Sequence, residues 1–142
     1  MNKQDMMLEM VKDHLNYTEE EMTAFKANPR NLEILDKVPE LLNTIFTAEV
    51  IEAHGCACQH QVGQKIIING DGSIASDRCP EKICIYLLQA LTPIVFGAQE
   101  FLYAGIDPNL LRFKQVGCFD IGVKCGGLGH VTMAFTSKKQ KG

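Results

Sequence analysis

The chain lacks the sequence features that mark exported, membrane-spanning and nucleic-acid-binding proteins. Its first fourteen residues mix acidic and basic side chains and contain no apolar segment of the kind that a secretory signal needs. The longest uncharged stretch, residues 83–99, is shorter than the roughly 20 residues that cross a bilayer and is interrupted by Gln89, Thr92 and Pro93. No basic stripe with interleaved aromatic residues is present. We therefore expect a cytoplasmic protein that binds neither membrane nor nucleic acid.

Cysteine is absent from the first third of the chain, where acidic residues are concentrated. Eleven of the seventeen Asp and Glu residues lie in residues 1–53, whereas all six cysteines lie between Cys56 and Cys125. A chain of 142 residues can bury a core without disulfides, and an intracellular protein has little use for them. The cysteines therefore indicate a metal site or a redox thiol centre. We expect an acidic helical prefix over residues 1–43 and a cysteine-rich module over residues 44–142, joined in one compact domain.

Helical patterns dominate the acidic prefix. Apolar residues recur at helical spacing through Met6, Met10 and Leu15, and Thr18 and Glu21 fit a capping box that opens a second helix. Asn28 and Pro29 indicate a new helix start, which Pro39 would end or kink. The apolar stripe around Met6 and Met10 leads us to expect a homodimer formed through these helices.

The module alternates strand and helix patterns, which predicts an α+β fold. Its small antiparallel sheet would pack on a central apolar helix that begins near Pro80, breaks at Pro93 and resumes over residues 94–104. The strands are expected over residues 44–53, 65–69, 73–76, 110–116 and 130–136.

A tract of alternating histidine and cysteine follows the first expected strand. His54, Cys56, Cys58 and His60 are spaced two apart, so in an extended strand neighbouring members would lie about 7 Å from each other. A Zn–S bond is about 2.3 Å long, so a straight strand cannot bring all four to one ion. Either the chain curls, which Gly55 would permit, or only one or two members are ligands. We favour Cys58 and Cys56, then His60. The alternative is two half-buried cysteines beside two surface histidines.

Two cysteines flank the expected start of the central helix. Pro80 fits the first helical position, which would put Cys79 at the N-cap, where helix N–H groups favour a thiolate. Cys84 would lie a turn further along, either as a ligand or as a small apolar residue of the helix face. The pair also allows a second chemistry, in which Cys79 is a redox thiolate and Cys84 resolves it.

The last two cysteines, Cys118 and Cys125, precede a glycine pair. Glycine after a cysteine lets backbone amides approach a metal-bound sulfur. Asp120 would either orient a ligand or cap a turn, whereas His130 fits a strand. The sequence has no C-x₂-C spacing, which lowers the case for a zinc ribbon or a ferredoxin.

Three of these cysteines carry a resemblance to a family. Cys58 followed by His60, Val62 and Gly63, then Cys84, then Cys118 with Phe119 and Asp120, resembles a family of small proteins of unknown function from anaerobic bacteria and archaea, over about residues 45–136. The resemblance implies that Cys58, Cys84 and Cys118 act together, and it implies no activity. Gln64 stands where that family usually has aspartate.

A weaker resemblance covers residues 97–135. That part is similar to 4-vinyl reductase-like small-ligand domains, whose last hairpin also carries two cysteines. This second resemblance implies a sensor or a carrier of a hydrophobic ligand.

Our leading expectation is an iron–sulfur or zinc centre built from three chain segments, with a redox or accessory role. The candidate ligands are Cys56, Cys58, His60, Cys79, Cys84, Cys118 and Cys125. The alternatives are a metal-free domain that binds a small ligand and a thiol redox protein that uses Cys79. Neither the substrate nor the redox partner follows from these residues.

Overall fold

The computed structural model describes residues 1–141 and shows two compact units rather than one. The first unit comprises residues 1–40, and the second begins at Leu41. The boundary lies near the expected end of the acidic prefix. Every residue of the apolar core cluster, from Leu41 to Phe135, belongs to the second unit.

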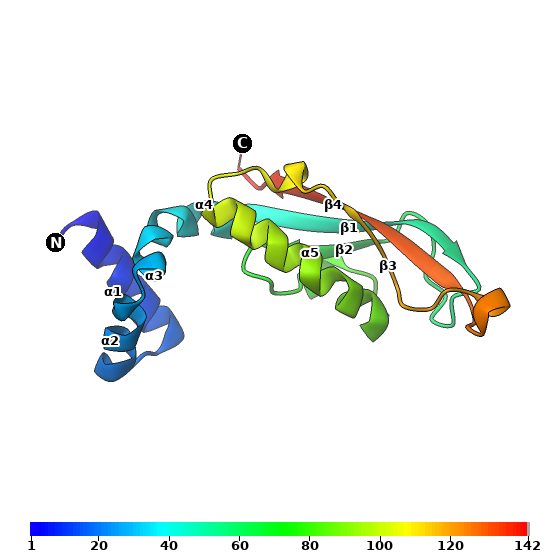
Figure 1. The fold of residues 1–142 in the computed structure, drawn as a ribbon, viewed down its shortest axis with the longest axis horizontal. Helices are drawn as coiled ribbons and strands as arrows, with labels where there is room; N and C mark the ends of the chain where they lie inside the picture. The colour runs from blue at the N-terminus through cyan, green and yellow to red at the C-terminus, as the bar shows by residue number, and fades with distance from the viewer. Residues whose placement is uncertain (142) are drawn as a thin grey trace. The chain divides into compact units, whose positions relative to one another are not determined.

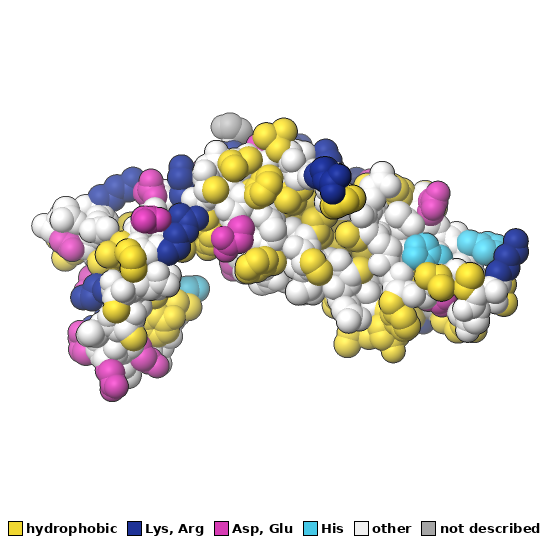
Figure 2. Space-filling model, in the orientation of Figure 1, with side chains coloured by type: hydrophobic (Ala, Val, Ile, Leu, Met, Phe, Trp, Pro, Cys, Tyr) yellow, Lys and Arg dark blue, Asp and Glu magenta, His cyan; other side chains and the backbone are white. Residues whose placement is uncertain are grey.

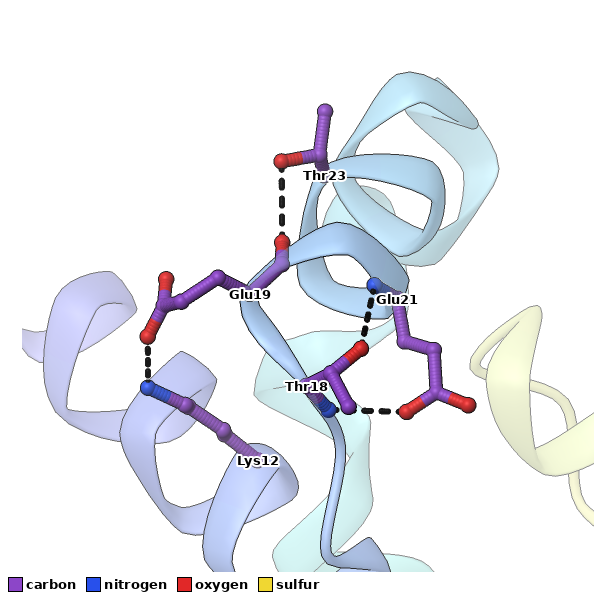
Figure 3. Close-up of polar contacts among 5 residues, drawn as sticks. All are labelled: Lys12, Thr18, Glu19, Glu21 and Thr23. Carbon is purple, nitrogen blue, oxygen red and sulfur yellow. Dashed lines mark hydrogen bonds and ion pairs between the residues drawn. The ribbon is translucent and has the colours of Figure 1, made fainter.

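The first unit consists of short helices. They are α1 (Lys3–Leu15), α2 (Glu19–Ala27), α3 (Pro29–Glu33) and a 3₁₀ helix over Leu35–Lys37. The expected capping box is confirmed, since Thr18 Oγ1 accepts the N–H of Glu21 at 3.1 Å and the Glu21 carboxylate accepts the N–H of Thr18 at 2.7 Å (Figure 3). An ion pair between Lys12 and Glu19 joins α1 to α2.

Pro39 has a different role from the one expected. It does not end a helix but lies in the first turn of α4 (Val38–Leu42), where the missing N–H of proline leaves no hydrogen bond unmade. The preceding helix α3 has already ended at Glu33.

The second unit is built on a four-stranded antiparallel sheet. Its strands are β1 (Thr44–His54), β2 (Lys65–Asn69), β3 (Gln115–Gly117) and β4 (His130–Lys139), in the order β2-β1-β4-β3. The expected strands at 44–53, 65–69 and 130–136 are confirmed. The strand expected at 110–116 is reduced to β3, because a 3₁₀ helix, Pro108–Leu110, occupies its beginning. Residues 73–76 form a single bridge, between Ile74 and Ile68.

One long apolar helix, α5 (Ile85–Tyr103), covers one face of the sheet (Figure 1). Alternate residues of β1 and β4 point toward it, as the period of two in a strand requires. Large, fully buried side chains in this layer include Phe46, Val50, Met133 and Phe135 from the strands and Leu87 and Leu91 from the helix. The α+β class is therefore confirmed.

The helix differs from the expected one in two ways. It begins five residues after Pro80, with Cys84 rather than Cys79 as its N-cap residue. It also continues unbroken through Pro93. Proline removes the hydrogen bond to the carbonyl group four residues earlier, which is that of Gln89. Both residues lie on the exposed side of the helix, where water can bind that carbonyl.

Among the helices of residues 1–141, α5 is long and apolar enough to cross a membrane by length and composition alone. Core helices of soluble proteins have the same properties, so this observation alone is weak evidence for a membrane span.

Candidate functional site

The histidine–cysteine tract curls back at the end of β1 instead of continuing as a strand. Gly55 and Gln59 both have left-handed backbone conformations, with φ of 66° and 61°. The N–H of Gln59 donates to the carbonyl oxygen of Cys56 at 3.0 Å, which closes a turn. Cys56 and Cys58 therefore lie in a turn rather than about 7 Å apart along one strand face.

The pairing of β1 with β4 places this turn next to the last hairpin. His54 pairs with His130 at the end of the β1–β4 ladder. Gly55 follows His54 and Gly129 precedes His130, so the two glycines lie next to each other just beyond the ladder. A Cβ added to Gly129 would lie 2.2 Å from the backbone of Gly55, so only glycine fits there. The N–H of Cys118 donates to the carbonyl of Val131 at 3.0 Å, which places that cysteine beside the same strand end.

His60 joins the turn to the start of α5. The ring is buried, and its Nε2 accepts the backbone N–H of Cys84 at 3.1 Å. Its Nδ1 lies 2.9 Å from Gln64 Oε1 and donates to it, since an amide oxygen can only accept. Both ring nitrogens are thus engaged, and this geometry gives His60 a structural role rather than that of a ligand.

Four cysteines from three chain segments line one cavity of about 220 Å³ with mostly apolar walls. They are Cys56 and Cys58 of the turn, Cys84 at the start of α5, and Cys118 of the last hairpin. Hydrogen bonding to the neighbouring Cys84 thiol, reinforced by partial burial, raises the pKa of Cys58 above the usual value of a thiol. All six cysteines are free thiols.

Cys118 has polar partners on two sides. Its Sγ accepts the backbone N–H of Val131 at 3.4 Å and lies 3.8 Å from Nδ1 of His130. It also lies 3.6 Å from the carbonyl oxygen of Asp120. These contacts hold Cys118 at the side of the cavity next to the beginning of β4.

Asp120 caps the glycine-rich loop and does not face the cavity as a free carboxylate. Its oxygens accept backbone N–H groups of Gly122 at 3.0 Å and of Leu128 and Gly129 at 3.1 Å. These bonds, led by that of Gly122, hold the pKa of Asp120 below its usual value. Of the two roles expected for this residue, the structure shows the turn cap.

Two of the candidate cysteines lie elsewhere. Cys125 is exposed in a 3₁₀ helix of the glycine-rich loop (Val123–Cys125) and does not line the cavity. Cys79 packs against the core, and its Sγ accepts the N–H of Ile67 at 3.2 Å. The expected placement of Cys79 at a helix N-cap is wrong, because the chain stays non-helical from Cys79 to Cys84.

Two aromatic residues of the cavity were missed in the sequence. Tyr86 and Phe119 line it together and pack edge to face, with ring centroids 4.6 Å apart. Each lies within two positions of a cysteine that lines the cavity, Cys84 or Cys118. That proximity is the only sequence signal that would have found them.

Within residues 1–141, no three His, Cys, Asp or Glu side chains converge closely enough to hold one metal ion. The four cavity cysteines therefore surround a space rather than a single point. The fold and this cavity define an α+β protein with a thiol-lined pocket. Comparison with known proteins found no matching family model, no matching curated protein and no matching solved structure.

Proposed function

We propose that this protein is a cytoplasmic iron–sulfur protein whose cluster is held by Cys56, Cys58, Cys84 and Cys118. The observation that carries the proposal is that these four thiols, from three separate segments, line one cavity. Four cysteine thiolates are the ligand set of the common iron–sulfur clusters. The proposal narrows the seven candidate ligands to four, since His60 is engaged at both nitrogens and Cys79 and Cys125 lie outside the cavity.

A cluster suits the cavity better than a single ion does. Zinc needs four ligands that converge to about 2.3 Å from one point, which would leave no space between the sulfurs. Here the sulfurs lie around about 220 Å³. Zinc remains the alternative metal.

The surroundings supply what a cluster site requires. An iron–sulfur cluster transfers single electrons, at a potential set by hydrogen bonds to its sulfurs and by its exposure to water. Val131 donates its N–H to Cys118, and Cys84 lies at the N-terminus of α5, although its side chain makes no capping hydrogen bond. Tyr86 and Phe119 shield one side of the cavity. These features support a redox or accessory role, without a defined substrate.

A second candidate function is a metal-free site for a small hydrophobic ligand. It is favoured by the apolar walls of the same cavity and by the aromatic pair. In that case, replacing Cys58 and Cys118 by serine would leave the fold and the ligand affinity nearly unchanged.

The third expectation, a redox thiolate at Cys79, was based on a helix N-cap position. In the structure that position belongs to Cys84. Cys79 instead packs against the core, where its Sγ accepts the N–H of Ile67.

The test is to measure iron, zinc and acid-labile sulfide in protein purified without oxygen, together with its absorption spectrum. We expect stoichiometric iron and sulfide in the wild type. Cys118→Ser should lose most of both, whereas the matched control Cys125→Ser should keep them, because only Cys118 lines the cavity.

The other outcomes are equally clear. Zinc without sulfide would indicate a zinc centre in place of the iron–sulfur cluster. Protein that contains neither iron nor zinc would favour the ligand-binding function. An equal loss of iron in Cys125→Ser would contradict the proposed ligand set, since that side chain is exposed and outside the cavity.

A further inference from the structure

Large apolar side chains that are exposed to water line the cysteine cavity or lie close in the sequence to residues that line it. We call them the pocket rim: Ile85, Tyr86, Phe119, Ile121, Val123 and Leu128. Tyr86, Phe119 and Leu128 also line the cavity itself. Figure 2 shows hydrophobic side chains gathered at the beginning of α5 and on the loop that follows β3. The apolar surface therefore adjoins the proposed site.

The rim is large enough for a stable protein contact. Its side chains are between 49% and 74% exposed. At roughly 175 Å² for a large apolar side chain, they present roughly 700 Å² in all. The largest apolar patch of a typical monomer is about 300–600 Å², and a standard interface buries about 800 Å² on each partner.

The loop that carries four of the six rim residues holds little charge, whereas Glu81 and Lys82 precede Ile85 on the helix side. Between residues 117 and 129 the only charged side chains are Asp120 and Lys124, and Asp120 is turned toward the amides of its own loop. Partners that are recruited by electrostatic steering need a charged surface, and anionic membranes need a basic one. An apolar surface with few charges is typical of contacts between identical subunits.

We propose that a second copy of this chain covers the cysteine cavity, rim against rim, in a symmetric homodimer. A two-fold contact joins the same patch on both subunits, so the patch must be complementary to itself. An apolar patch with little charge meets this condition, because it creates little like-charge repulsion. The contact itself depends on the rim alone; its benefit, the exclusion of water from a cluster, rests on the proposed function.

This interface differs from the one that the sequence suggested. Met6 and Met10 of α1 are exposed, as a dimer through the N-terminal helices would require. With Leu15, which is also exposed, they form a smaller apolar surface than the rim. The two interfaces predict opposite responses to substitution, and one experiment separates them.

The experiment is sedimentation equilibrium of the full chain at micromolar concentration. We expect the wild type to be a dimer. Phe119→Glu should weaken the dimer by at least about 30-fold, which is the loss typical of a central interface residue. The control is Phe96→Glu, because Phe96 is also on the surface of the second unit, at 64% exposure against 69% for Phe119, and lines a different pocket.

A monomeric wild type would overturn the proposal. So would an unchanged dimer in Phe119→Glu, or a dimer that is lost in Met10→Glu and kept in Phe119→Glu. Circular dichroism on each variant verifies that it is folded. The wild type could also be monomeric and float with phosphatidylglycerol vesicles, with that flotation lost in Phe119→Glu. This result would show that the rim binds a membrane surface instead of a second copy.

Iron and sulfide are measured on the same samples, so that the two proposals fail separately. A dimer without iron removes the cluster and leaves the interface. A monomer with a full cluster overturns the interface and leaves the proposed function.

Discussion

At the scale of single residues, His60 shows how a side chain of ligating type can hold a site together without binding the metal. It lies four residues after Cys56, and its ring connects Gln64 with the backbone of Cys84. The ring therefore fixes the distance between two of the segments that carry cavity cysteines.

We predict that His60→Ala lowers the free energy of unfolding by about 1–3 kcal/mol, the cost of leaving a buried donor without a partner. His54→Ala, at an exposed position of the same tract, should change it by less than about 0.5 kcal/mol. Urea denaturation of both variants checks this. Unchanged stability with a complete loss of iron would instead make His60 a ligand.

At the scale of secondary-structure elements, α5 contains Pro93 in its interior, where proline removes a helical hydrogen bond. The side chains of Gln89 and Pro93 are exposed, so the missing hydrogen bond is tolerated but not replaced within the helix. Leu91 and Ile94, on the opposite side of the helix, stay buried. The packing of the apolar face is therefore what holds the helix together through position 93.

We predict that Pro93→Ala raises the free energy of unfolding by about 1–3 kcal/mol, because alanine restores the N–H donor to the Gln89 carbonyl and relieves the ring contact. Thr92→Ala, one residue earlier and also exposed, is the control and should have little effect. The midpoint of urea unfolding is the measurement. A destabilised Pro93→Ala would show that the proline ring makes contacts that matter.

The elements that could be predicted are those whose pattern agrees with their packing. β1, β2 and β4 carry regular strand patterns, and the capping box at Thr18 is local in sequence. The start of α5 could not be predicted, because Pro80 imitates a helix start while the N–H of Cys84 binds His60, 24 residues away. The same long-range contact holds Cys84, and not Cys79, at the cavity.

The site was predictable in part. Sequence reasoning identified all four cavity cysteines and allowed for a curl at Gly55, whose φ is 66°. Their local patterns alone did not separate them from Cys79 and Cys125, because that choice depends on long-range contacts such as the pairing of β1 with β4 and the bond between His60 and Cys84. It also missed the aromatic walls, since no local pattern distinguishes Tyr86 or Phe119 from core residues.

At the scale of the whole molecule, the second unit holds the entire core cluster, which begins at Leu41. The Leu41 side chain is 5% exposed, and its carbonyl lies so close to Gly70 that a Cβ there would not fit. Residues 1–40 contribute no member of that cluster. The second unit should therefore fold by itself, provided that it includes Leu41.

We predict that a chain of residues 41–142 keeps the fold and the metal content of the full protein. A chain of residues 44–142 should lose about 2–5 kcal/mol of stability, comparable to the deletion of a buried leucine side chain. Circular dichroism and urea unfolding compare the two. If residues 41–142 alone are unfolded, the core extends into the first unit.

The pairing of β1 with β4 also determines when the cavity can exist during synthesis. Cys58 and Cys118 are sixty positions apart in the chain and come together only when these two strands pair. A nascent chain on the ribosome has no pocket until β4 has emerged, so a cofactor could enter only after that strand has been synthesised. Once bound, it would link distant parts of the backbone and restrict the unfolded chain, as a covalent staple does.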